Sequence, residues 1–537
     1  MPGDLLDNQA MIIWATLRRT VGALMVGGIL ASCTGPTTAP PEPLSPSDLT
    51  RRVEVYTVGF RGISDKYIQP LSVADIALGG LQGLSSIDPA LHAERRADRV
   101  KLSMDGREIA SDDAPGLMDA RGWGSLTAKF EQTARLQSSL IGQATDEKVF
   151  EAVFDGVLAD LDVFSRYAGA AQAKRNRARR EGFGGIGIRF KITAGRPLVT
   201  DVHAGTPAAA AGMRVGDEIT HIAGTALLKP KVRDIVNQLR GPIHSDVNVG
   251  IYRASDDRSR TLTLTRKHIV PPTVETEFRN GVGYLKISSF NQATAEGVAK
   301  ALRKMRRNND VRLKGLIVDL RGNPGGLLKQ SVKVADLLLT HGHIVSTRGR
   351  HPDSLHHYEA GGRDLADGLP IAVLVDGKSA SASEIVAAAL QDQGRAAIIG
   401  TASFGKGTVQ TVIRLPNDGE ITLTWSRFIA PSGYTLHGLG VRPVICTSGH
   451  DGPPSKAIER FTDAETDTRA VYTSWRRALF DQKDLRTTLR RTCKSQRRRS
   501  DTDRKVARFL LDDENLYARA IGITSSESQA LKTPTRP

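Results

Sequence analysis

A group of three serines carries the first sign of chemistry in this sequence. Ser379, Ser381 and Ser383 follow the apolar run 371–376 and open a segment with helical spacing. A serine acts as a nucleophile when a base takes its proton and when N–H groups stabilise the oxyanion that forms. Backbone N–H groups at a helix start can supply that stabilisation. The cluster therefore predicts acyl transfer if a base lies nearby.

The base that the sequence indicates is a lysine. None of the 12 histidines lies in a strand-end motif beside the serines. Five of them are grouped in a stretch that we expect to be a loop: His341, His343, His351, His356 and His357. Lys406 lies in SFGKGTVQ, between glycines and apolar residues, where burial would lower its pKa from about 10.4. A lone lysine is more often an exposed surface residue, so Lys406 is a candidate base only in combination with the serine segment.

The elements around these residues predict an α/β core. The segments 315–320, 371–376 and 397–400 have the composition of buried strands, and helical patterns follow the first two. Such alternation predicts a mixed or largely parallel sheet covered by helices. Sites in these sheets lie beyond the carboxyl ends of strands. Both the serine cluster and the glycine turn 321–326 are expected there.

An upstream block, residues 178–268, resembles a PDZ domain. It contains GGIGI, then AGTPA, then AGMRVGDEI in the expected order. The resemblance implies a loop that binds a peptide's terminal carboxylate, formed by Gly185, Ile186, Gly187 and Ile188. It also implies that the helix at 231–239 flanks a groove in which the peptide adds as a strand.

The order of all these motifs resembles the carboxyl-terminal processing peptidases, also called tail-specific proteases. The matching segments are GLIVDLRGNPGGLL, SASASEIVAAALQD, GRAAIIG and SFGKGTVQ, downstream of the PDZ block. The resemblance implies that Ser381 is the nucleophile and Lys406 the general base. Their separation along the chain is that of the family. No metal or cofactor is implied.

The same resemblance implies roles for further residues. Gln410 would orient Lys406, and Asp392 would support the fold or the site. Ala382 would offer one oxyanion N–H, and a second would come from Gly325 or Gly326. Ser379 and Ser383 are interpreted as helix-capping residues, a common role of serine at that place.

One departure from the family lies before the PDZ block. The family often has an Asp-Pro-His-Ser-like segment there, whereas this chain has LDVFSRY at 161–167. We expect this change to affect the junction between the helices and the PDZ domain and to leave the dyad untouched.

The N-terminus predicts export. Arg18 and Arg19 precede the apolar run 21–30, which ends in LASC at Cys33. This order resembles the lipobox of bacterial lipoproteins, in which the cysteine is lipidated. An ordinary signal peptide and an uncleaved anchor are the alternatives. The expected location is the periplasmic face of a bacterial membrane, where the remaining cysteines, Cys446 and Cys493, could pair.

Six segments follow from these patterns. They are a lipoprotein-type signal peptide at 1–33, a Pro-rich tether at 34–48, a helical N-terminal region at 49–177, the PDZ domain at 178–268, a protease core at 272–446 and a basic helical extension at 447–537. The net charge of +16 is concentrated in runs such as 174–180 and 497–499, which lack interleaved aromatic residues. We therefore expect no nucleic-acid partner.

The function expected is a serine endopeptidase that cleaves exported proteins near their C-termini after its PDZ domain binds the tail. Its partners would be proteins with exposed apolar C-termini and a membrane that holds the lipid anchor. A non-catalytic PDZ adaptor at the membrane is the alternative, and a basic membrane-surface scaffold is a third. The presence of both Ser381 and Lys406 favours the protease.

Overall fold

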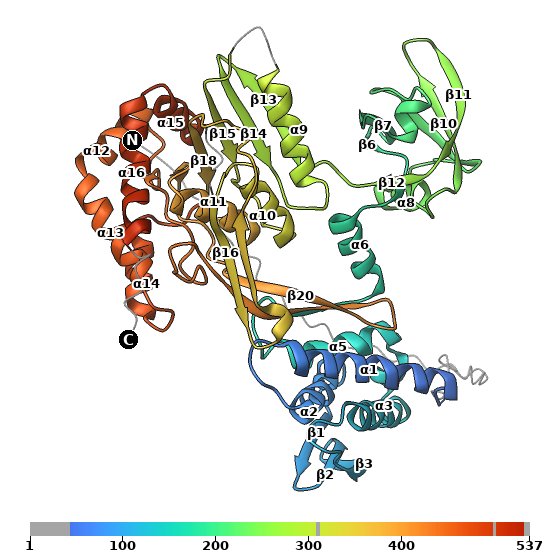
Figure 1. Cartoon of the computed structure of the whole chain (residues 1–537). Coiled ribbons are helices and arrows are strands. Elements are labelled where there is room, and N and C mark those ends of the chain that lie inside the picture. The colour runs from blue at the N-terminus through green and yellow to red at the C-terminus, as the bar shows by residue number, and fades with distance from the viewer. Residues whose placement is uncertain (1–42, 308–311, 498–500, 531–537) are drawn as a thin grey trace, which may run out of the picture.

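The computed structural model describes residues 43–307, 312–497 and 501–530. Figure 1 shows an N-terminal region in blue, a PDZ domain in green set apart from the rest, a central sheet, and a layer of red C-terminal helices. The signal peptide, Cys33 and the first part of the tether lie outside the described residues. In the part that is described, no helix is both long and apolar enough to cross a membrane.

Helices dominate the N-terminal region, as expected. They are α1 (Pro46–Lys66), α2 (Val73–Gly83), α3 (Ala120–Gln137), α4 (Ser139–Gln143) and α5 (Asp146–Leu158), with a 3-10 turn at Leu84–Ser86. The side chains of Ser45, Ser72 and Thr145 accept backbone N–H groups at three helix starts. Helix α1 begins at Pro46, inside the stretch expected to be a tether.

A small antiparallel sheet interrupts these helices, and the sequence reading did not anticipate it. Its strands are β1 (Leu91–Arg96), β2 (Arg99–Met104) and β3 (Arg107–Asp113), in that order. Leu91 and Ala93 alternate with exposed residues, so the period is two rather than 3.6. The turn at Asp105 and Gly106 has positive φ at both residues, as a tight hairpin requires.

The PDZ domain contains a sheet with the order β11-β10-β8-β7-β6, and β9 pairs with β8. Its strands are β6 (Ile188–Thr193), β7 (Arg196–Val202), β8 (Glu218–Ile222), β9 (Thr225–Ala226), β10 (Asp246–Arg253) and β11 (Arg258–Thr265). Its helices are α7 (Pro207–Ala210) and α8 (Val232–Leu239). Helix α6 (Ala170–Glu181) leads into the domain, and β5 (Phe183–Gly185) pairs with β12 (Lys267–Ile269) where the chain enters and leaves.

The central core contains a six-stranded sheet with the order β13-β14-β15-β18-β19-β22. The strands are β13 (Val274–Arg279), β14 (Val282–Ile287), β15 (Gly315–Asp319), β18 (Ile371–Val375), β19 (Ala397–Gly400) and β22 (Ile445–Cys446). Only the β13–β14 pair is antiparallel, so the expected mixed, largely parallel sheet is confirmed. Helices α9 (Thr294–Arg306), α10 (Leu328–Asp336) and α11 (Ala382–Asp392) pack on it, and every residue of α11 is buried.

A second sheet lies beside this core and connects it to the N-terminal region (Figure 1). Its order is β17-β16-β21-β20, and β4 (Arg166–Ala168) also pairs with β21. The strands are β16 (Gly342–Gly349), β17 (His356–Ala360), β20 (Thr408–Arg414) and β21 (Glu420–Ile429), with a 3-10 turn at Pro352–Ser354. Ile413 and Ile421 of this sheet are buried in the core of the N-terminal helices.

The C-terminal extension is helical, as expected, and it covers the other face of the central sheet. Its helices are α12 (Pro454–Asp463), α13 (Glu465–Arg477), α14 (Lys483–Arg491), α15 (Thr502–Leu511) and α16 (Glu514–Ala530). Leu510 and Tyr517 pack with Ile317 and Leu374 of the sheet in one buried cluster. The extension is therefore one layer of a three-layer core, a role that its sequence pattern does not predict.

Candidate active site

Ser381 occupies a sharp turn between strand β18 and helix α11. It is the N-cap residue of the helix, and its backbone has φ 56° and ψ −114°. A positive φ is costly for a residue with a Cβ, and such strained turns are found where a strand presents a nucleophile ahead of a helix. Ser381 is half-buried, whereas its neighbours in the cluster are fully buried. The backbone thus singles out Ser381 from the three serines.

The other two serines of the cluster hold loops together. Ser379 Oγ donates to the Leu320 carbonyl at 2.8 Å, and Ser383 Oγ donates to the Asn323 carbonyl at 3.0 Å. The expectation that both cap the helix was wrong, because Ser381 itself is the N-cap residue and Ser383 lies inside the first turn. Both serines instead fasten the serine loop to the glycine turn.

The glycine turn lies directly against Ser381. A Cβ on Gly325, whose φ is +100°, would lie 2.7 Å from the Ala380 carbonyl oxygen and 2.9 Å from Ser381 Cβ. The Gly325 N–H donates to Asn323 Oδ1 at 2.8 Å, and this bond occupies it. Of the two glycines expected to supply an oxyanion donor, Gly326 is therefore the better candidate. Ala382, the other expected donor, is the first residue of α11, where N–H groups have no partner within the helix.

Lys406 lies in the loop between β19 and β20 and is half-buried. Its Nζ is 4.7 Å from the centroid of the Phe164 ring. Burial, assisted by the positive charge of Arg166, lowers the pKa of Lys406 to about 8, while the charges of Asp162 and Glu384 act in the opposite direction. A lysine with such a pKa is partly neutral near physiological pH, as a general base must be.

The LDVFSRY segment reaches this lysine, so the expectation that it leaves the dyad untouched was wrong. Phe164 packs against the ammonium, and Asp162 and Arg166 both act on its pKa. The segment is held in place because Thr424 Oγ1 of β21 donates to Asp162 Oδ1 at 3.0 Å. Pairing of β4 with β21 brings this distant stretch of chain to the site.

One buried carboxylate joins the serine and the lysine. Glu384 accepts the backbone N–H of Ser381 at 2.7 Å and the backbone N–H of Lys406 at 2.9 Å. It also accepts the Gly405 N–H at 2.7 Å and the Ser403 hydroxyl at 2.5 Å. Burial raises the pKa of Glu384, and these donors oppose the rise. Glu384 is not among the predicted site residues, although an acidic residue three positions after a serine N-cap is a known helix-start signal.

Two other expected residues lie in different surroundings. The Gln410 amide, on β20, donates to the hydroxyls of Thr408 at 2.9 Å and Thr424 at 3.3 Å, so its orienting role on Lys406 stays a prediction. Asp392, at the end of α11, accepts from Ser432 at 2.7 Å and pairs with Arg476 of α13 at 2.8 Å. Asp392 therefore supports the fold by joining the core to the extension.

The grouped histidines form part of a hairpin rather than the expected loop. His343 lies on β16, and His356 and His357 lie on β17. The rings of His343 and His357 stack with centroids 4.3 Å apart, and Ser346 Oγ is within hydrogen-bond distance of both. These side chains interact with one another and with the hairpin.

A histidine that the sequence analysis does not single out, His437, lies beside the ring that contacts the lysine. The ring of His437 is 6.2 Å from that of Phe164, centroid to centroid, and edge-on to it. Burial lowers the pKa of His437, with a further contribution from Arg427, so the ring is neutral around pH 7.

The expected carboxylate loop of the PDZ domain lies at the start of its edge strand. Gly185 ends β5, Ile186 and Gly187 connect the strands, and Ile188 begins β6. The Ile186 carbonyl accepts from Ala208 at 3.0 Å, which fixes the loop. Among the described residues β6 pairs only with β7, so its outer side is open to a further strand.

Comparisons with known proteins agree with this architecture. Residues 281–446 match the model of peptidase family S41, and residues 184–265 match that of the PDZ domain. The chain is 39% identical to a carboxy-terminal-processing protease of Bartonella bacilliformis over 58% of this chain and 72% of that protein. It is 30% identical to the carboxy-terminal processing protease CtpB of Bacillus subtilis over 65% of this chain and 73% of that protein.

Among solved structures, the photosystem II D1 C-terminal processing protease is 22% identical, with a TM-score of 0.37 over 73% of this chain and 92% of that one. Because the chain covers more than two thirds of each of the two sequence relatives, the family is established by those matches. This chain belongs to the carboxy-terminal processing proteases, serine-type peptidases of family S41.

Proposed function

We propose that this chain is an endopeptidase in which Ser381 is the nucleophile and Lys406 the general base. The observation that carries the proposal is the shared carboxylate of Glu384, which binds the backbone N–H groups of both residues. A single buried anchor keeps two loops that are distant in sequence at one place. The lowered pKa of Lys406 provides the neutral amine that the reaction needs.

The chemistry then follows the usual course of acyl transfer. Neutral Lys406 Nζ takes the proton of Ser381 Oγ as Oγ bonds to the scissile carbonyl carbon. The N–H groups of Ala382 and Gly326 hold the resulting oxyanion. When the C–N bond breaks, the lysine ammonium returns its proton to the leaving amine. Lys406 then deprotonates a water molecule, whose oxygen bonds to the acyl carbon. The ester bond to Ser381 Oγ breaks, Oγ takes the proton back from Lys406, and the acyl group leaves as an acid that ionises to a carboxylate.

We further propose that substrates are exported proteins whose exposed, apolar C-termini bind the PDZ domain. The open edge of β6 can accept an extended peptide as an added strand. Ile235 and Leu239 of α8 share one apolar core with Ile186 of the expected carboxylate loop. Ile188 and Phe190 of β6 are only partly buried against this core, which supports apolar contacts with a bound tail.

Lipid anchoring at Cys33 on the periplasmic face of a bacterial membrane is also a proposal. Cys33 lies outside the described residues, and the support comes from the order of basic residues, apolar run and cysteine. The disulfide between Cys446 and Cys493 adds support for export, because such bonds persist in oxidising compartments.

The first prediction distinguishes the three serines. Ser381→Ala should lower the turnover of an unfolded protein substrate by on the order of 10³-fold or more, because the nucleophile is lost. Ser379→Ala and Ser383→Ala should lower thermal stability and keep measurable turnover, because they remove loop contacts only. An active Ser381→Ala protein would favour a different nucleophile, whereas a wild-type protein without turnover would favour the PDZ adaptor.

The second prediction concerns pH. Because only neutral Lys406 accepts a proton, kcat should rise about tenfold per pH unit below pH 8 and level off above it. Lys406→Ala and Lys406→Arg should both be inactive, since a guanidinium stays protonated at any working pH. Near-normal turnover of Lys406→Arg would rule out the general-base role.

The third prediction concerns the PDZ domain. A peptide with a free apolar C-terminus should bind about tenfold or more tightly than the same peptide with an amidated end, because the charge that the loop captures is lost. Titration calorimetry on Ser381→Ala protein measures this without cleavage of the peptide. Equal affinities would show that the loop at Gly185–Gly187 does not bind the carboxylate.

The fourth prediction concerns the membrane. Mass spectrometry of the mature N-terminus should show a diacylglycerol on Cys33, and Cys33→Ser should move the protein from the membrane fraction to the soluble fraction. An unmodified Cys33 in mature protein would contradict the lipobox interpretation.

A further inference from the structure

An arginine of the C-terminal extension binds the loop that carries Lys406. Arg490, in the last turn of α14, donates Nη1 to the Leu439 carbonyl at 2.5 Å and Nη2 to the Ser403 carbonyl at 3.1 Å. Nη2 also lies 3.5 Å from the Phe404 carbonyl. These carbonyls belong to the segments immediately before and beside Lys406. The planar guanidinium can hold several acceptors at once, which an ammonium does less well.

The loop needs such support because it forms little regular structure. Residues 402–407 belong to no helix or strand, so their path is fixed by separate bonds to other segments, such as that of the Phe404 N–H to the Ser379 carbonyl at 2.9 Å. A general base must stay within hydrogen-bond reach of its serine, and a displacement of about 1 Å can cost about 100-fold in rate.

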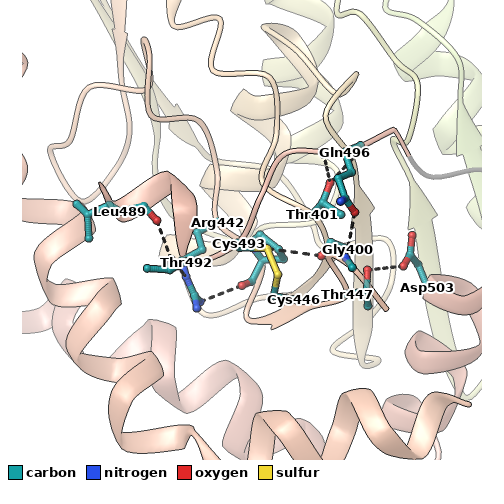
Figure 2. Close-up of a disulfide and its surroundings, with 12 residues drawn as sticks. Gly400, Thr401, Arg442, Cys446, Thr447, Leu489, Thr492, Cys493, Gln496 and Asp503 are labelled. Carbon is teal, nitrogen blue, oxygen red and sulfur yellow. Dashed lines mark hydrogen bonds between the residues drawn. A yellow bond between two sulfur atoms is a disulfide. The ribbon is translucent and has the colours of Figure 1, made fainter. Parts of the chain in front are cut away.

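The next residues of the extension bind the serine loop as well. The Gln496 carbonyl accepts the Gly377 N–H at 2.7 Å. It also accepts the Thr401 hydroxyl at 2.9 Å (Figure 2). Gly377 lies between β18 and Ser381, and Thr401 begins the lysine loop. A Cβ on Gly377 would lie 2.6 Å from Ser495 Oγ, so the two segments are in close contact. One short stretch of chain thus touches the loops of both dyad residues.

A disulfide holds this stretch to the central sheet. Cys493, between Arg490 and Gln496 in sequence, is bonded to Cys446 at the end of β22 (Figure 2). The bond fixes segment 490–496 beside the strand whose neighbour, β19, leads into the lysine loop. The segment therefore has a covalent attachment at its centre and hydrogen bonds to the catalytic loops at both ends.

We propose that Arg490 is a positioning residue for proteolysis, and that the disulfide-bonded segment 490–496 holds the lysine loop against the serine loop. The inference rests on the Ser381–Lys406 dyad proposed above. Arg490 does not touch the reacting atoms, and it acts by fixing the backbone from which Lys406 projects. The C-terminal extension is in this way a working part of the active site.

The test compares Arg490→Met with Arg491→Met, a matched change at the exposed neighbour on the same helix. We expect Arg490→Met to lower kcat on a short peptide by about 10- to 100-fold, with KM changed less than about threefold. Arg491→Met should behave as wild type in both. Arg490→Lys should recover part of the loss, because an ammonium can still donate to one or two carbonyls.

The pH profile provides a readout that general destabilisation would leave unchanged. A loosened loop admits water to Lys406, where Asp162 and Glu384 favour the ammonium and Arg166 opposes it. The rise of kcat should therefore move to higher pH in Arg490→Met. The pH dependence of the rate at which a fluorophosphonate labels Ser381 should also move to higher pH. Thermal unfolding reports the folded fraction, and Arg490→Gln, which keeps an amide donor, replaces the Met variant if that one does not fold.

A double-mutant cycle tests the disulfide. The pair Cys446→Ser and Cys493→Ser, added to Arg490→Met, should cost little beyond Arg490→Met alone, because both changes release the same loop. If the loss of kcat from removing the disulfide instead multiplied the loss from Arg490→Met, the role of the bonded segment would be overturned. Wild-type kcat in folded Arg490→Met, or a loss with no change in the pH profile, would overturn the positioning role of Arg490. Activity of Ser381→Ala would instead refute the dyad, so the two failures are distinguishable.

Discussion

The candidate active site depends on a single carboxylate buried in the protein core. Removing the charge of Glu384 from water carries a cost of several kcal/mol unless donors surround it. Here the donors are three backbone N–H groups and a hydroxyl, and they come from both the serine turn and the lysine loop. Because the carboxylate requires these partners, the folded state in which it is satisfied is also the state in which Ser381 and Lys406 are together.

The lysine obtains its altered basicity from a different part of the chain. Phe164 belongs to the junction between the N-terminal helices and the PDZ domain, and it shields the amine from one side. Asp162 and Arg166 of the same stretch exert opposing electrostatic effects on it. The electrostatic surroundings of the Lys406 amine and the placement of its backbone are therefore set by residues more than 200 positions apart.

Sequence patterns predict the parts of the fold in which local composition decides the structure, such as buried strands and the turns that follow them. The apolar runs at 315–320 and 371–376 became adjacent parallel strands, and the glycine turn and the serine cluster meet beyond them. The small sheet at β1–β3 was not expected, because its strands are short and half exposed within a helical region. Glu384 has a local signal as a helix-start residue, but its contact with the Lys406 loop is a property of the folded chain.

Contacts between distant segments were beyond the reach of the sequence for a physical reason. Phe164 reaches Lys406 only because β4 pairs with β21, and Arg490 reaches Ser403 only because α14 packs on the core. Arg490 lies in no motif, and the LDVFSRY segment that contains Phe164 has no period or spacing that places it beside Lys406. The pairing of Cys446 with Cys493 was left open for the same reason, since spacing alone does not set which cysteines meet.

The segment that matches the family model and the segment that forms the folded core end at different residues. The family match ends at residue 446, yet Ile317, Leu374 and Ile399 of the central sheet are covered by residues beyond that point, such as Leu510 and Tyr517. A parallel sheet is stable only when both of its faces are covered. When only the chain up to residue 446 has left the ribosome, one apolar face of the sheet is therefore still uncovered. The last helices synthesised complete the core of this peptidase, and an excised fragment that follows the homology boundary would carry an aggregation-prone surface.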